Sequence, residues 1–138
     1  MRTKRFRYLA SLAAMAVLLA TMNSATAGTG RVLNENSANK TYAIKLGSTF
    51  HLVLHSTYWS LTPIITSAPI KLLGDPVPTL DASAPGNPPG MGKGTLEWAL
   101  KAVRVGNFSL KATRTSCGEA LRCTDSQSNY LVKIKITK

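Results

Sequence analysis

The chain has 138 residues, with 17 Lys or Arg, 6 Asp or Glu and two cysteines. This length suits one domain and excludes a multi-domain enzyme or a multi-span membrane protein. Two cysteines also exclude a dense disulfide scaffold and a four-cysteine zinc ribbon. Hydrophobic residues make up 44% of the chain, a share inflated by one apolar block near the N-terminus.

That apolar block belongs to a predicted secretory signal peptide, residues 1–27. Four basic residues lie within positions 2–7, and residues 8–20 form an apolar stretch shorter than the roughly 20 residues that span a bilayer. Ala25 and Ala27 then supply the small side chains that signal peptidase accepts. We expect cleavage after Ala27 and a secreted protein, in the periplasm or the extracellular space. An uncleaved membrane anchor is the alternative.

Removing the signal peptide leaves thirteen basic and six acidic residues, a net charge of +7. A protein with this charge can adhere electrostatically to anionic surfaces, although charge alone selects no partner.

The two cysteines, Cys117 and Cys123, are separated by five residues. In an oxidising compartment we expect them to form a disulfide that stiffens this loop. A metal site or a catalytic thiol is the alternative, which neither a Cys-x-x-Cys spacing nor a nearby histidine supports.

From residue 41 onward, apolar and polar residues alternate with period two, and no stretch shows a helical apolar stripe. Seven strands in one domain predict an all-β, immunoglobulin-like β-sandwich, residues 41–138. Residues 28–40 are polar, and we expect a flexible N-terminal arm. The expected strands are 41–47, 49–56, 59–65, 69–73, 95–103, 106–114 and 130–138.

Two connections in this sandwich are long. Residues 75–94 carry five prolines and four glycines and cannot run as a central strand. Such a loop is either a binding element or a tolerated insertion. The second connection, residues 114–129, contains the expected disulfide.

The sequence shows no pattern of residues for catalysis or metal binding. His51 and His55 lie on one face of an expected strand, but roughly 13 Å apart, too far to share one ion directly. The carboxylates are scattered, and no serine lies in a nucleophile motif. We therefore expect no enzyme, no cofactor and no metal. Trp98 and Phe108 fall on the inward face, and without exposed aromatics between the lysines we expect no nucleic-acid partner.

One part of the chain resembles the chagasin-type inhibitors of papain-like cysteine peptidases. Residues 90–114, GMGKGTLEWALKAVRVGNFSLKATR, match that family's glycine-rich loop, alternating strand, glycine turn and second strand ending at an arginine. Residues 47–61 resemble the family's strand, loop and Tyr-x-Trp region, with Tyr58 and Trp59 adjacent, and the final YLVKIKI resembles its closing strand. The likeness covers residues 42–137.

The resemblance implies an immunoglobulin-like fold and inhibition without chemistry, in which three loops at one end fill the peptidase's active-site cleft. The carried-over loop residues are His55, Ser56, Thr57 and Tyr58 in the first loop, Gly90, Met91, Gly92, Lys93 and Gly94 in the second, and Arg114 in the third.

The chain departs from the family pattern in all three loops. Residues 55–57, HST, replace a longer run that contains proline and glycine. Lys93 interrupts the paired glycines, and Arg114 is followed by Thr115 rather than proline.

We expect a monomeric, secreted inhibitor whose partner is a papain-like cysteine peptidase. The alternative is a secreted adhesion or surface-binding module on the same fold, without a peptidase target.

Overall fold

A computed structural model describes residues 30–81, 92–118 and 121–138. The predicted signal peptide, together with Gly90 and Met91 of the second loop, lies outside these residues. The elements are β1 (Arg31–Leu33), the 3-10 helix η1 (Glu35–Ser37), β2 (Thr41–Lys45), β3 (Thr49–His55), β4 (Ser60–Leu61), β5 (Ile70–Leu72), β6 (Val77–Thr79), β7 (Thr95–Ala102), β8 (Gly106–Thr113), the helical turn α1 (Asp125–Ser128) and β9 (Asn129–Thr137).

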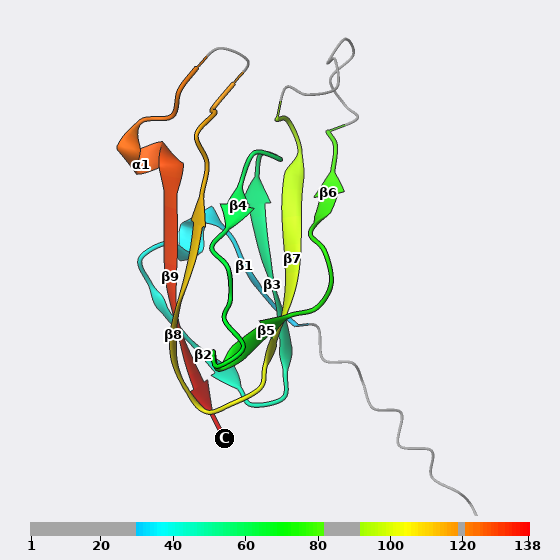
Figure 1. Ribbon diagram of the computed structural model, residues 1–138, viewed down its shortest axis with the longest axis vertical. Helices are drawn as coiled ribbons and strands as arrows, with labels where there is room; N and C mark the ends of the chain where they lie inside the picture. The colour runs from blue at the N-terminus through cyan, green and yellow to red at the C-terminus, as the bar shows by residue number, and fades with distance from the viewer. Residues whose placement is uncertain (1–29, 82–91, 119–120) are drawn as a thin grey trace, which may run out of the picture.

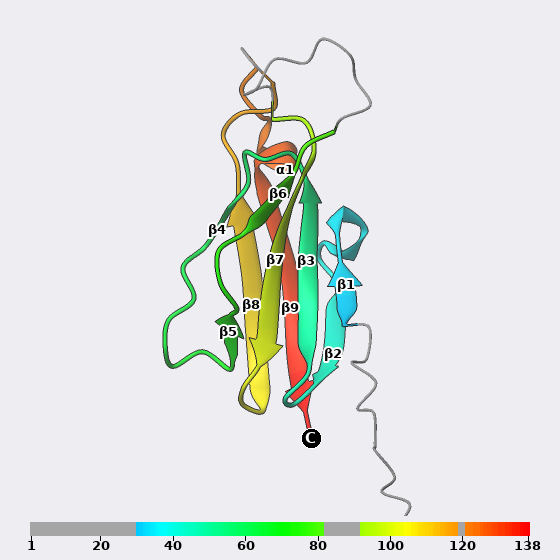
Figure 2. The same ribbon diagram turned by 90° about the vertical axis from the view of Figure 1, so that its right-hand side faces the viewer.

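The strands form two sheets that face each other, so the predicted all-β sandwich is confirmed (Figure 1). One sheet has the order β1-β3-β7-β5, with β6 also paired to β7, and the other has the order β2-β9-β8-β4. Both are mixed, because β1 runs parallel to β3 and β2 runs parallel to β9. Viewed edge-on, β1 and β2 lie at one edge of the sandwich and the β4–β5 connection lies at the other (Figure 2).

The core lies between the sheets and follows the alternation in the sequence. In β3 and β7 every second side chain is buried, and in β9 the inward positions alternate with Lys133 and Lys135. Trp98 is buried in this core, as predicted, and Trp59 is buried there too. Its fully enclosed side chains are Leu33, Phe50, Leu52, Leu54, Ile70, Leu100, Leu110, Val132, Ile134 and Ile136.

The expected flexible arm is wrong for residues 30–40. Leu33 is fully buried, and β1 pairs with β3 in one sheet while β2, a few residues later, pairs with β9 in the other. Between them, Asn34 caps η1 and the Tyr130 hydroxyl donates to the Asn34 carbonyl (3.1 Å). This N-terminal strap, residues 31–45, therefore ties the two sheets together. The domain begins at β1 rather than at residue 41.

Two further differences concern strands. The expected strand at residues 59–65 is reduced to β4, since Pro63 offers no backbone donor and the chain then crosses to the other sheet. The proline-rich connection contributes the unpredicted strand β6, which contains Pro78. This strand pairs only with β7, and a sheet edge tolerates the missing N–H of proline. The described residues therefore form nine strands where seven were expected.

Among the residues described, no helix has the length and apolar character needed to cross a membrane.

We predict that Leu33→Ala lowers the free energy of unfolding by about 2–5 kcal/mol, because it opens a cavity beneath the strap. The matched control is the neighbouring Val32→Ala. Val32 is 58% exposed, and its truncation should cost less than about 1 kcal/mol. Urea unfolding measures both. Equal small losses would show that the strap adds nothing to stability.

Candidate functional site

Three connections lie at one end of the sandwich, away from the C-terminus (Figure 1). They are the first connection (residues 56–59, between β3 and β4), the second connection (described residues 80–81 and 92–94, between β6 and β7) and the third connection (described residues 114–118 and 121–124, between β8 and α1). We call this the loop end. Every described residue of the three loops carried over from the resemblance lies in these connections, except His55. His55 ends β3, directly before the first connection.

The first connection is a tight turn fixed on both sides. Ser56 has a φ of 98°, an unusual value for a residue other than glycine, and its hydroxyl accepts a hydrogen bond from the Tyr58 N–H (3.2 Å). The Trp59 indole N–H donates to the His55 carbonyl (2.9 Å), which spans the turn. The ends of the first connection are therefore held together by the Trp59 side chain, which is buried in the core.

Backbone hydrogen bonds join the first connection to the second. The Ser56 N–H donates to the Gly94 carbonyl (2.8 Å), and the Thr57 N–H donates to the Gly92 carbonyl (3.1 Å). Gly92 and Gly94 have φ values of 66° and 118°. A Cβ on Gly92 would lie 2.2 Å from the Tyr58 ring, and one on Gly94 would lie 2.2 Å from the Thr79 carbonyl oxygen. Glycine is required here both by the backbone conformation and by the space.

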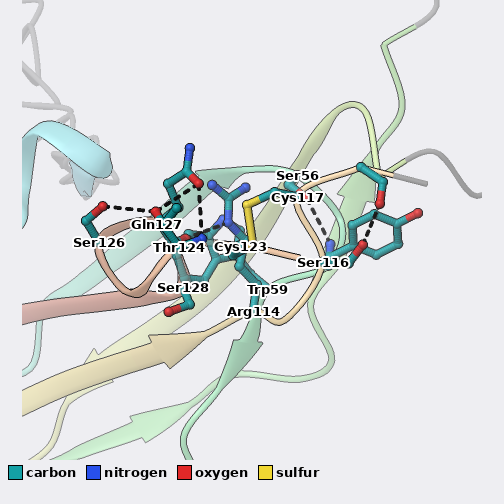
Figure 3. Close-up of a disulfide and its surroundings, with 12 residues drawn as sticks. Ser56, Trp59, Arg114, Ser116, Cys117, Cys123, Thr124, Ser126, Gln127 and Ser128 are labelled. Carbon is teal, nitrogen blue, oxygen red and sulfur yellow. Dashed lines mark hydrogen bonds between the residues drawn. A yellow bond between two sulfur atoms is a disulfide. The ribbon is translucent and has the colours of Figure 1, made fainter. Parts of the chain in front are cut away.

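The third connection is a protrusion closed by the predicted disulfide between Cys117 and Cys123, which is confirmed. Inside the loop, the Cys117 N–H donates to the Leu121 carbonyl (2.9 Å), and Ser116 and Arg122 form an isolated β-bridge. On the far side of the disulfide, the Thr124 N–H donates to the Gln127 side chain and starts the helical turn α1 (3.2 Å) (Figure 3). Covalent closure limits the conformations open to this protrusion.

Arg114 connects the third connection to the first. Its guanidinium lies over the Trp59 ring, 4.6 Å from the ring centroid, and its Nε donates to the Gln127 carbonyl (2.8 Å). Figure 3 shows Arg114 and Trp59 together beside the disulfide. Arg114 is half-buried, and its cation–π contact with Trp59 holds the third connection against the first.

Glu35, on η1, contacts the loop end at His55, and the sequence reasoning missed it. Its carboxylate accepts hydrogen bonds from the His55 N–H and the His55 ring, the latter over 3.1 Å. Burial alone would raise the pKa of Glu35, but the bonds from the His55 backbone, from its own backbone and from the His55 ring outweigh burial and lower it. The only signal in the sequence was the Asn34-x-x-Ser37 spacing, which resembles a helix cap within a polar segment.

The two histidines lie beside different carboxylates. His51 Nδ1 is 2.6 Å from Glu97 Oε1, while His55 contacts Glu35. In the part of the chain that the structure describes, no three His, Cys, Asp or Glu side chains gather in a group that could hold a metal ion.

The fold is similar to that of known proteins. Amebosin, known from a solution structure, matches with a TM-score of 0.56 at 16% identity, covering 80% of this chain and 100% of amebosin. The cysteine protease inhibitor EhICP2 from Entamoeba histolytica matches with a TM-score of 0.51 at 14% identity, covering 78% of this chain and 94% of EhICP2. PbICP-C, solved in complex with falcipain-2, gives a TM-score of 0.39 at 14% identity, covering 78% and 98%. The first two likenesses show a shared fold. No family model and no curated protein matches this chain by sequence.

We predict that the Glu35–His55 contact responds to acid. Because the pKa of Glu35 is lower in the folded protein than its ordinary value of 4.5, its stabilising contribution is complete above that value and is lost as the pH falls through the folded pKa. Amide shifts of His55 and Ser56, followed by NMR from pH 5 down to pH 3, should change below about pH 4.5, the ordinary Glu value. In Glu35→Gln this acid transition should be absent. An unchanged transition in the variant would contradict the assignment.

Proposed function

We propose that this protein is a reversible inhibitor of papain-like cysteine peptidases and that it inserts the loop end into the active-site cleft. The observation that carries the proposal is the bonding of the three connections to one another at a single end of the sandwich. EhICP2, which shares the fold, is a cysteine protease inhibitor, and this supports the same activity here.

The arrangement of the loop end suits insertion into a cleft. The first and second connections are joined by two backbone hydrogen bonds, and Arg114 joins the third connection to Trp59. A surface whose loops are already fixed before binding loses little conformational entropy when it binds. At Gly92 and Gly94 the absence of side chains lets a backbone approach a catalytic centre closely. The inhibitor then acts by filling the cleft, and none of its own side chains reacts.

The departures from the chagasin-type pattern have a structural counterpart. The first connection is short, but hydrogen bonds from its two backbone N–H groups hold it against Gly92 and Gly94. The third connection lacks the family's proline and is closed instead by the Cys117–Cys123 disulfide. In this proposal all three connections contact the peptidase, and the first is held beside the second by its hydrogen bonds to Gly92 and Gly94.

Export is part of the proposal, supported by the charged and apolar segments of residues 1–27 and by a disulfide that suits an oxidising compartment. We predict that the protein recovered from the host's periplasm or medium begins at Gly28. N-terminal sequencing and intact mass measure this, and a form that keeps residues 1–27 in the membrane fraction would contradict it.

The inhibitory loop end is tested with two matched variants of the oxidised chain. Thr57→Glu adds a carboxylate at the first connection, and Val105→Glu adds one at the β7–β8 turn of the opposite end, where Val105 is 49% exposed. Both are titrated into papain and into a cathepsin-type peptidase while residual activity is followed. We expect stoichiometric inhibition by the unmodified protein, an inhibition constant raised at least about tenfold by Thr57→Glu through a buried charge in the interface, and a change below about twofold for Val105→Glu.

Equal effects of the two variants would contradict binding through the loop end. No inhibition by the unmodified protein at tens of micromolar would contradict the inhibitor itself, and would leave a surface-binding module as the function of this fold.

A further inference from the structure

The outer face of the four-stranded sheet carries a row of lysines. Lys45 on β2, Lys111 on β8, and Lys133 and Lys135 on β9 are exposed, while their chain neighbours Ile44, Leu110, Val132, Ile134 and Ile136 are buried. Because successive side chains of a strand point to opposite faces, all four ammonium groups emerge on the side away from the core.

The strand register sets the order of these lysines. Lys111 lies opposite Leu131, two positions from Lys133, and Lys135 lies opposite Ala43, two positions from Lys45. The four therefore follow one diagonal across β8, β9 and β2. Consecutive members are about 7–8 Å apart at their backbones, from the strand rise and the spacing between strands. We call this the lysine diagonal.

No opposite charge balances the lysine diagonal. Strands β2, β8 and β9 contain no Asp or Glu. Neither the His51–Glu97 nor the His55–Glu35 pair involves these strands. Glu97, on β7, belongs to the other sheet. Within the described residues, the lysine diagonal is therefore a uniformly positive surface, and Lys111, Lys133 and Lys135 lie on two adjacent strands of it.

A shallow hollow of about 310 Å³ lies beside the middle of the diagonal. Lys133 lies there opposite both Thr41 and Ser109 in the register, with Asn107 beside them, and Phe108 and Ile134 complete the lining. Short hydroxyl and amide groups around one ammonium can donate to and accept from a hydroxyl-rich ligand while the ammonium pairs with its anionic group.

We propose that the lysine diagonal and its hollow bind a linear acidic polysaccharide, whose carboxylate or sulfate groups pair with the four ammonium groups in turn. The row of charges suits a chain molecule with repeated anionic groups, and the hydroxyl and amide groups of the hollow suit the hydroxyl groups of a sugar. A single-stranded nucleic acid would need a series of exposed aromatic side chains for base stacking, whereas the described outward positions of β2, β8 and β9 contain none and the half-buried Phe108 is the one aromatic residue that lines the hollow.

This surface lies on the flank of the sandwich, whereas the three connections lie at its end (Figure 1). Binding of a polysaccharide here therefore leaves the loop end open, and the proposal does not depend on the inhibitory function. A chain held in this way would be retained on an anionic cell envelope or matrix.

The test compares two double variants that remove the same charge from opposite sheets. Lys133→Gln/Lys135→Gln alters the lysine diagonal, and Lys71→Gln/Lys101→Gln alters a lysine pair of the five-stranded sheet, where β5 and β7 place these residues opposite each other. Each variant and the unmodified chain are bound to immobilised dextran sulfate over a salt series by biolayer interferometry. Neutral dextran and an oligothymidylate of similar charge serve as comparison ligands, and titration of a peptidase reports loop-end function separately.

We expect dextran sulfate to bind the unmodified protein, with an affinity that falls as salt rises. The diagonal variant should raise the Kd about tenfold at about 100 mM salt and flatten the salt dependence, while the control variant should change the Kd less than about twofold. Equal losses in both variants, equal binding to neutral dextran, or tighter binding to the oligothymidylate would each overturn the proposal. Loss of peptidase inhibition in the control variant alone would bear on the inhibitor function and not on this surface.

Discussion

The indole of Trp59 is the contact on which the loop end depends. It is buried in the core, its N–H donates to the His55 carbonyl across the first connection, and its ring carries the Arg114 guanidinium of the third connection. A buried aromatic ring has few alternative positions in a close-packed interior. The first and third connections both contact this ring and therefore take fixed positions relative to the sandwich. The second connection is held in turn by the hydrogen bonds from the Ser56 and Thr57 N–H groups.

The N-terminal strap supports the same end from the other side. Its strands β1 and β2 belong to different sheets, and Glu35 between them accepts hydrogen bonds from His55. The geometry of the loop end is thus set by sheet pairing, core packing and one carboxylate together. The lysine diagonal depends on the pairing of β2, β9 and β8 but not on the contacts of the loop end, because alternation turns its lysines outward and the register sets their order. The loop end and the lysine diagonal therefore lie on separate parts of the surface.

Sequence reasoning succeeded where the signal was local and failed where the contact was distant. The long strands β3, β7, β8 and β9 follow a clear alternation, and the Cys117–Cys123 spacing allowed a disulfide that is present. Residues 31–40 of the N-terminal strap were missed because they are mostly polar, and Leu33 is the one hydrophobic residue among them that is buried. Strand β6 was missed because two of the five prolines lie in or next to it, and only the free edge of β7 permits the pairing. Glu35 and His55 are 20 residues apart, and nothing local joins them.

The sequence by itself determined the sandwich class, the inward-facing strand residues and the outward lysines, because a period of two assigns each strand residue to one face or the other. It also marked the glycines at which a backbone can approach closely. Only the tertiary structure decided which connections meet and which groups hold them. The contacts of Ser56 with Gly94, of Arg114 with Trp59 and of Glu35 with His55 all join segments that are distant in the sequence, and they depend on strand pairing and core packing that no local pattern specifies.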